Sequence, residues 1–202
     1  MRFLTGFLVA GLLFSAAAQQ PPKKAPSGGG RGQPVSSEAA FKVLNALNEQ
    51  SKLVVTFMGA TQYTDLKAEN CFGWRFPDGP RILGESGGEY YGLSMETVGA
   101  KGTEGKKYDA IGALYAEAPF LLQGKLFKKG AYMVYAAPDE LRLDLSIKED
   151  VRSTTLALKE KLDKSLFGKK KGEPAPRFSF VQVAGQVYLV IGSNRFRLSL
   201  AG

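Results

Sequence analysis

The sequence predicts a mainly β fold of the α+β class: an antiparallel β-sandwich or curved sheet with one N-terminal helix and a second helix further along the chain. Two segments favour strands. In LRLDLSIK, residues 141–148, and in RFRLSL, residues 195–200, apolar and polar side chains alternate, as they do in a strand with one face in water. A helix is favoured in 36–50, where apolar residues recur at three- and four-residue spacing.

The N-terminal helix is expected over residues 36–50. Ser37 is the predicted N-cap, and Glu38 falls in the first turn, where a carboxylate suits the helix dipole. The apolar stripe, which we expect to lie on a sheet, consists of Ala40, Phe41, Leu44 and Leu47.

Strands are expected in much of the remaining chain. The run KLVVTFMGA, residues 52–60, is rich in β-branched and aromatic residues and predicts one mostly buried strand. Residues 61–105 are rich in glycine and proline, which predicts loops with short strands near 72–76 and 90–98.

The C-terminal half carries the clearest pattern. Residues 124–146 predict two strands around a turn at 137–139, and residues 177–200 predict a three-stranded meander with short turns. We interpret residues 154–167 as the second helix, with a strand as the alternative, because leucines recur there every four residues, at Leu158, Leu162 and Leu166.

The N-terminus has the features of a secretory signal peptide, which we assign to residues 1–18. Arg2 precedes an apolar stretch of about a dozen residues, too short to cross a bilayer, so an uncleaved anchor is the weaker alternative. We expect cleavage after Ala18, a disordered tether over 19–34 and a single β-rich domain over 35–202. The mature protein is expected to be soluble and exported, either periplasmic or extracellular.

The net charge is +8, but much of it lies in appendages. Setting aside Arg2, the basic residues of the tether and the run 169–171 leaves the rest of the chain near +1. The lysine run is either a solvated loop or a contact for an anionic surface; it comprises Lys169, Lys170 and Lys171. Nucleic acid is not an expected partner, and membrane contact is expected to be peripheral at most.

Histidine is absent, which excludes catalytic triads, thiol–imidazole dyads and zinc sites that need an imidazole. We therefore expect no metal site and no cofactor. Cys71 is the single cysteine. We predict that it packs in the core, with an intermolecular disulfide and a reactive thiol as the alternatives.

A set of aromatic residues, most of them in the glycine-rich region, suggests a concave ligand site, although such rings also cap sheet cores. The candidate ligand-binding residues are Phe57, Phe72, Trp74, Phe76, Tyr90 and Tyr91. A carboxylate pair for hydrolysis would come from Glu117, Asp139, Glu140, Glu149 and Asp150, which otherwise suit a solvated rim.

Residues 119–145 resemble part of a group of uncharacterised exported bacterial β-sandwich domains that carry a hairpin of the form G-K-x-L-P-A-G-x-Y. The corresponding residues 124–132 read GKLFKKGAY: Gly124, Lys125, Gly130 and Tyr132 match, Phe127 stands for the leucine, and Lys128 and Lys129 replace Pro-Ala. The resemblance implies an exported protein with a sandwich-like sheet, and it implies no activity.

Three functional hypotheses follow. The first is an exported, non-enzymatic binding or structural module of the cell envelope. The second is a carrier of lipid or another apolar ligand on an open, concave sheet face. The third is a carboxylate-dependent hydrolase.

Overall fold

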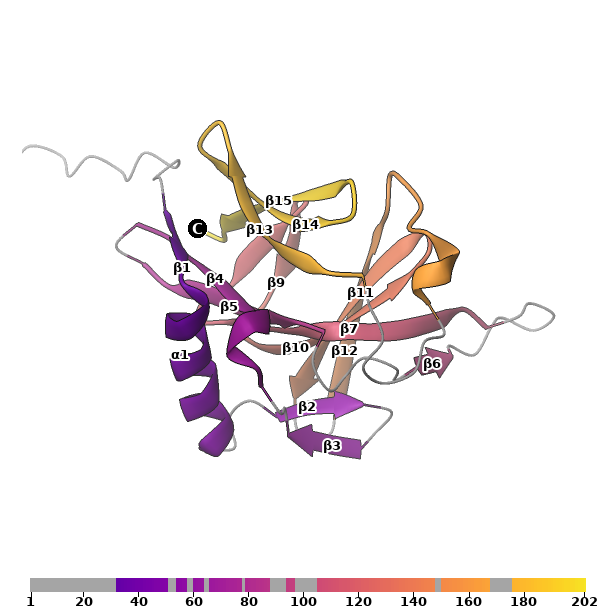
Figure 1. Ribbon diagram of the computed structural model, residues 1–202, viewed down its shortest axis with the longest axis horizontal. Helices are drawn as coiled ribbons and strands as arrows, with labels where there is room; N and C mark the ends of the chain where they lie inside the picture. Colours follow the sequence, from indigo (N-terminus) through magenta and orange to yellow (C-terminus); the bar gives the residue numbers. More distant parts are fainter. Residues whose placement is uncertain are drawn as a thin grey trace, which may run out of the picture.

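Figure 1 shows the computed structural model of the chain. The structure describes residues 32–50, 54–57, 60–63, 66–77, 79–87, 94–96, 105–147, 150–167 and 176–202. Within these ranges the protein is a β-sandwich with one α-helix, which confirms the predicted mainly β class and its N-terminal helix but not the second helix. Several predicted features lie outside the described residues: the predicted signal peptide, most of the predicted tether, Tyr90, Tyr91 and the lysine run 169–171.

The first sheet has eight strands and is antiparallel throughout. Its order is β1-β4-β5-β7-β10-β11-β12, and β6 pairs with β7 beside this path. The strands are β1 (Gln33–Val35), β4 (Cys71–Arg75), β5 (Arg81–Ser86), β6 (Ser94–Glu96), β7 (Lys107–Ala116), β10 (Gly130–Ala137), β11 (Glu140–Ile147) and β12 (Asp150–Ala157).

The second sheet has five strands in the order β13-β14-β15-β8-β9. The predicted meander forms three of them, and the short hairpin β8–β9 pairs with the last strand of the meander. The strands are β8 (Phe120–Leu122), β9 (Lys125–Phe127), β13 (Phe178–Val183), β14 (Gln186–Ile191) and β15 (Asn194–Leu200).

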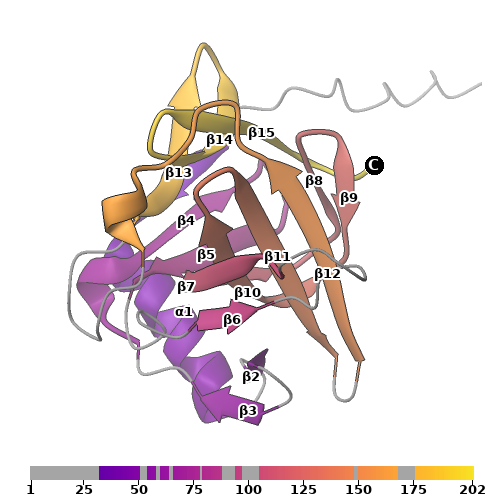
Figure 2. The same cartoon turned by 90° about the vertical axis from the view of Figure 1, so that its right-hand side faces the viewer.

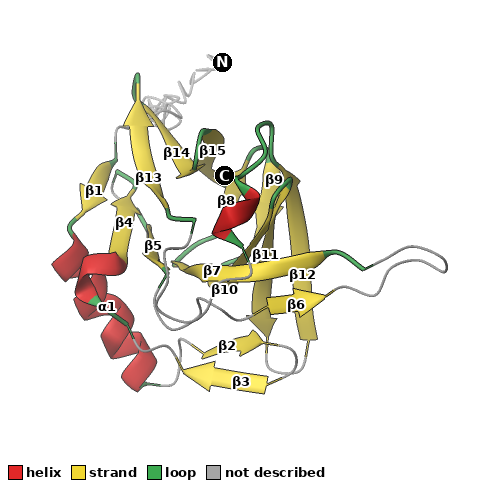
Figure 3. Cartoon of the chain, turned by 45° about the vertical axis from the view of Figure 1, so that its right-hand side comes forward, coloured by secondary structure: helices red, strands yellow, loops and turns green. Residues whose placement is uncertain are grey.

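The two faces of the first sheet are covered differently. The second sheet packs on one face, and the other face carries helix α1 (Ser37–Glu49) and the hairpin of β2 (Val54–Phe57) and β3 (Ala60–Tyr63). In Figure 1 the second sheet lies above the first, and α1 and the hairpin lie below it. Figure 2 and Figure 3 show the same arrangement from two other sides. An apolar cluster therefore lies on each side of the first sheet.

Helix α1 confirms the predicted N-terminal helix, with one correction at its start. The N-cap is Ser36, not Ser37, and its hydroxyl accepts a hydrogen bond from the Ala39 N–H at 3.3 Å. Ala40 and Leu44 are buried beneath the helix.

The predicted helix over residues 154–167 is wrong. Residues 154–157 end strand β12, in register with β11, and the chain then runs without regular structure to a short 3-10 turn, η3 (Lys164–Leu166). The N–H groups of Leu158 and Leu162 donate to carbonyls of the β10–β11 turn instead of to a helical ladder. The β-branched residues of VRSTT, 151–155, favour a strand, and this preference outweighs the leucine spacing.

Several other expectations need correction. Gln33 and Pro34, placed in the tether, belong to β1, which pairs with β4. Residues 52–60 do not form one strand, since β2 and the start of β3 form a hairpin. Strands β5, β7 and β8 were not predicted. The polar face of residues 141–148 is not fully exposed to solvent, because Asp144 is only 4% exposed.

The segment that resembles the exported domains crosses between the sheets. Within GKLFKKGAY, β9 pairs with β8 in the second sheet, whereas β10 pairs with β7 and β11 in the first. The Tyr132 hydroxyl donates to the Lys128 carbonyl at 2.6 Å, and this hydrogen bond joins β10 to the segment that links it to β9. This segment is therefore not a single hairpin.

A β-bulge keeps the apolar side of β7 on the sandwich core. Val134 pairs with Gly112 and Tyr135 pairs with Ala110, so Ile111 has no partner in β10. Because side chains alternate along a strand, this extra residue lets both Ile111 and Leu114 point at the second sheet. Gly112 has a φ of +148°, and a Cβ there would lie 2.1 Å from the Glu85 carbonyl oxygen.

We predict that Gly112→Ala lowers the free energy of unfolding by about 3 kcal/mol or more, because the added methyl group meets backbone in a packed core. The control is Gly185→Ala, where φ is also positive, at +80°, but no atom lies within 4 Å of the added carbon. Backbone strain alone predicts roughly 1–2 kcal/mol for the control. Urea titration measures both values, and equal losses would contradict the steric argument.

Candidate functional site

The aromatic residues proposed from the sequence lie mainly in the core. Trp74 and Phe76 are 2% and 8% exposed. Phe72 is half-buried and makes edge-to-face contacts with two rings of β13, Phe178 at 5.3 Å and Phe180 at 5.1 Å between centroids. These three residues thus pack between the sheets and line no open cleft. The side chains of Phe57, Tyr90 and Tyr91 lie outside the described residues.

Cys71 is buried, which confirms the prediction that it packs in the core. Its thiol donates to the Lys67 carbonyl at 3.3 Å. Burial raises the pKa of Cys71 to about 12, and the carboxylates of Glu85 and Glu69 add to the effect. At neutral pH the thiolate, which is the nucleophilic form, is therefore scarce.

Glu117 is held by Arg81. The Arg81 backbone N–H donates to Glu117 Oε2 at 2.8 Å, and its guanidinium donates to both carboxylate oxygens. These hydrogen bonds lower the pKa of Glu117 below its ordinary value of 4.5. The group is thus ionised at neutral pH and fully engaged by its partner.

The other described carboxylates of the hydrolase hypothesis are also bound to a cation. Lys106 Nζ lies 2.7 Å from an oxygen of Asp139 and 2.7 Å from one of Glu140. Glu140 also accepts from the Tyr108 hydroxyl at 2.8 Å. Burial acts to raise the pKa of Glu140, but hydrogen bonds from Lys106, Thr155 and Tyr108 outweigh it and the pKa is lowered.

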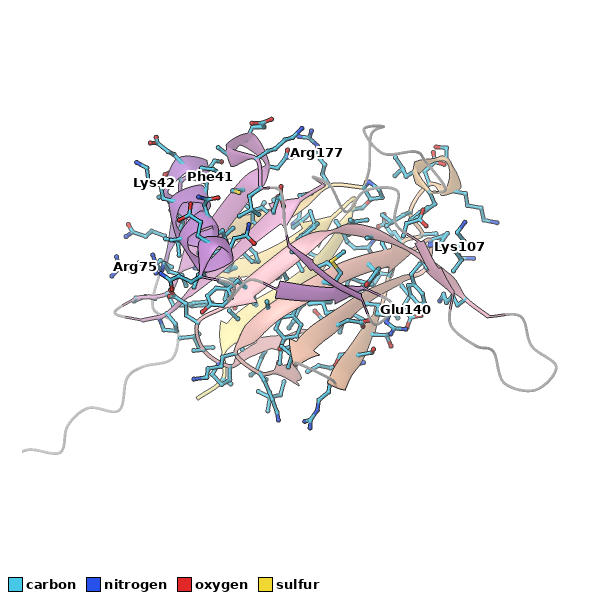
Figure 4. The ribbon with its side chains drawn as sticks, turned by 90° about the horizontal axis from the view of Figure 1, so that it is seen from below. Phe41, Lys42, Arg75, Lys107, Glu140 and Arg177 are labelled. Carbon is cyan, nitrogen blue, oxygen red and sulfur yellow. The ribbon has the colours of Figure 1, made fainter. Side chains whose placement is uncertain are left out.

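A second ion pair extends this polar cluster along β11. Arg142 donates to both oxygens of the buried Asp144, at 2.7 and 3.0 Å, and also to Ser153 on β12 at 2.7 Å. Its guanidinium lies 5.6 Å from the centre of the Tyr108 ring. Figure 4 views the face of the first sheet that carries α1. Glu140 lies at one end of this view, and α1, with Phe41 and Lys42, lies at the other end. The cations and carboxylates of this cluster are paired with one another, as in a polar network that stabilises the fold. The side chains of Glu149 and Asp150 lie outside the described residues.

We predict that Glu117→Gln lowers the free energy of unfolding by about 1 kcal/mol at pH 7, a modest value because the ion pair is partly in solvent. A lowered pKa in the folded state stabilises the protein above pH 4.5, and the gain disappears as the pH falls through the folded-state pKa. Wild type and variant should therefore converge in acid. The control, Glu38→Gln on the exposed surface of α1, should change little at either pH. A constant difference down to pH 2 would contradict this account.

The outer face of the second sheet, which points away from the first sheet, combines apolar and basic side chains. Side chains alternate along a strand, so the residues between the buried ones point outward. The buried residues of β14 and β15 are Val187, Leu189, Ile191, Phe196 and Leu198. We define this outer face as Leu121, Leu126, Ser179, Val181, Val183, Gln186, Tyr188, Val190, Arg195, Arg197 and Ser199.

No acidic residue occurs in the two segments that build the second sheet, residues 119–130 and 176–202. They contain six basic residues: Lys125, Lys128, Lys129, Arg177, Arg195 and Arg197. Without its basic appendages, the chain has a net charge near +1. Six of the remaining positive charges lie in the segments of the second sheet, so the net charge of the other residues is close to −5. This asymmetry was not predicted, because the basic charge was assigned to the appendages, although the absence of Asp and Glu from these segments is visible in the sequence.

The two arginines of β15 are available to a partner. Both are exposed, and they stand two residues apart on the outer face, roughly 7 Å along the strand. The Nε–H of Arg197 donates to Gln186 Oε1 at 2.8 Å, which orients the guanidinium. Between the side chains that the structure places, ion pairs form at Lys42, Arg81, Lys106 and Arg142, none of which belongs to the second sheet.

A small hollow lies beside Arg195. Its volume is about 40 Å³, and it is lined by Gln123, Ala157, Lys159, Asn194, Arg195 and Phe196. The Asn194 amide is already used, because it exchanges two hydrogen bonds with the Glu160 backbone at 2.7 and 3.0 Å. One water needs about 10–15 Å³ on this measure, so the hollow suits the oxygen atoms of one small anion but not a lipid chain.

Aromatic contacts fix the second sheet at both edges. At the β13 edge, Phe72 of the first sheet packs against two rings, as described above. At the other edge, Phe120, Phe127 and Tyr132 form a cluster with centroids 5.1–5.9 Å apart, which joins β8 and β9 to β10. The outer face is therefore held on a packed scaffold.

Within the ranges that the structure covers, three or more potential metal ligands do not gather at any point, and none of the helices combines the length and apolar character needed to traverse a bilayer. Comparison with protein-family models, with curated protein sequences and with solved structures gave no match.

Proposed function

We propose that the protein is an exported, non-enzymatic binding module of the cell envelope and that it binds an anionic envelope component through the outer face of the second sheet. One observation carries the proposal: Arg195 and Arg197 lie exposed on the outer face, and the segments that build the sheet contain no acidic residue. Such a surface attracts anions and repels cations over about a Debye length. The signal-peptide pattern of residues 1–18 supports export.

The packing of the two sheets favours this proposal over a lipid carrier. A lipid carrier would need a concave, apolar sheet face that is open to the ligand. In the described part of the chain, the apolar face of the first sheet is packed against β13, β14 and β15. The hollow beside Arg195 is too small and too basic for an acyl chain.

The ion pairs favour it over a hydrolase. Carboxylates that act in hydrolysis need different protonation states at neutral pH. Glu117 and Glu140 instead both have lowered pKa values, and each is bound by a cation.

Neutralising the two arginines should release the protein from the envelope. We predict that Arg195→Gln with Arg197→Gln lowers co-sedimentation with isolated envelope fragments about tenfold, since each removed charge weakens contact with an anionic surface. The control is Lys42→Gln with Lys107→Gln, which removes the same charge from exposed positions away from the second sheet (Figure 4). Equal binding by both double variants would contradict the assignment to the outer face.

Export predicts a defined N-terminus. We expect the protein recovered from the periplasm or medium to begin at Gln19, because the small residues 16–18 suit signal peptidase. Intact-mass measurement after cell fractionation tests this. A full-length chain that begins at Met1 and stays in the cytoplasm would contradict the proposal.

A further inference from the structure

We propose that the anionic component is the surface of a phospholipid bilayer that contains acidic lipids, and that Leu126 and Val183 enter its interfacial region while Arg195 and Arg197 contact headgroup phosphates. This inference rests on the function proposed above and names its ligand.

The distribution of exposed apolar residues carries the inference. Among the described residues, the exposed large hydrophobic side chains are Leu126, at 64%, and Val183, at 42%. Both belong to the acid-free outer face that carries the arginines. A soluble polyanion offers nothing apolar to bind such side chains, whereas the interface of an acidic bilayer offers phosphate and hydrocarbon together.

The register places these two side chains at opposite edges of the face. Leu126 pairs with Leu121, which pairs with Ser199, and Val183 pairs with Gln186 on the other side of β15. The row crosses five strands, which corresponds to roughly 19 Å at the usual strand spacing. Sheet twist turns the edges relative to one another. A fluid headgroup layer adapts to such a twisted surface more readily than a rigid partner does.

The middle of the face suits the headgroup layer. Tyr188 pairs with Arg197, and Val190 pairs with Arg195, so each arginine has a half-buried aromatic or aliphatic neighbour. Tyrosine is enriched at membrane interfaces because its ring is apolar and its hydroxyl is polar. The hollow beside Arg195 does not belong to the outer face, because inward-facing Asn194 and Phe196 also line it.

A second copy of this chain is a poor occupant. A two-fold symmetric dimer through this face would bring Arg195 and Arg197 of both copies together without a carboxylate from either second sheet. Like charges across an interface are unfavourable.

The experiment measures vesicle binding by the mature chain. The probes are vesicles of phosphatidylcholine alone, vesicles in which about one quarter is phosphatidylglycerol, and inorganic polyphosphate as a soluble polyanion. We expect binding to the acidic vesicles and none to phosphatidylcholine. Arg195→Gln with Arg197→Gln should lower the affinity for acidic vesicles about thirtyfold. Leu126→Ser with Val183→Ser should lower it about tenfold and leave polyphosphate binding unchanged.

Each outcome decides a separate point. Binding to polyphosphate but not to acidic vesicles overturns the membrane inference and leaves the proposed function standing. Binding to neither overturns both. Vesicle binding that the serine variants do not weaken overturns the role of Leu126 and Val183. Circular dichroism and thermal unfolding of each variant distinguish lost contact from lost fold.

A fluorescence measurement tests insertion directly. Leu126→Trp should show a blue-shifted emission with acidic vesicles and quenching by brominated lipid, since its indole would leave water. Lys107→Trp, at the exposed start of β7 in the first sheet, is the matched control and should show neither change. Trp74 is buried and contributes a constant background. Equal quenching of both variants would overturn the proposed orientation.

Discussion

The apolar layer between the two sheets determines which side chains of the second sheet point into solvent. Side chains alternate along a strand, so burial of Val187, Leu189 and Ile191 obliges Tyr188 and Val190 to face outward. The same rule applied to β15 turns both arginines out. A slip of one residue in the pairing would bury these charges in the core, at a cost that no partner offsets, so the register of the second sheet is strongly specified. The candidate binding surface is in this sense a direct result of core packing.

The bulge in β7 performs a related task for the first sheet. Without the extra residue, Ile111 and Leu114 would lie on opposite faces of the first sheet. The buried hydroxyl of Ser86 then accepts a hydrogen bond from the Phe178 N–H at 3.0 Å, close to Gly112, and ties the start of β13 to the end of β5. The two sheets are joined there by a polar contact as well as by apolar packing, which fixes the position of the meander.

Much of the fold could be predicted because its strongest signals are local. The alternation of β11 and β15, the short turns of the meander and the stripe of α1 each depend on neighbours in sequence. The second helix was mispredicted because the spacing of Leu158 and Leu162 suits either a helix or an extended segment that packs on one side. The non-local contacts that decide between them are the pairing of residues 154–157 with β11 and the hydrogen bonds of both leucine N–H groups to the β10–β11 turn. The burial of Asp144 could not be foreseen, since it depends on Arg142 and on the β2–β3 hairpin lying over this face. The basic sheet was accessible from composition, but only if residues 119–130 and 176–202 are recognised as parts of one sheet, and that pairing is not local.

The pairing of β15 with β8 has a consequence for how recognition arises. Leu198 and Leu122 are partners although more than seventy residues separate them, and the surface that carries Arg195, Arg197 and Leu126 on one face exists only once this contact forms. Contacts of such long range form slowly, because loop closure must precede any gain from them. A nascent or partly folded chain would hold its arginines and its exposed leucine on separate, mobile hairpins. Attachment would thus be confined to molecules that have completed their tertiary structure, so that arrival at the ligand reports successful maturation.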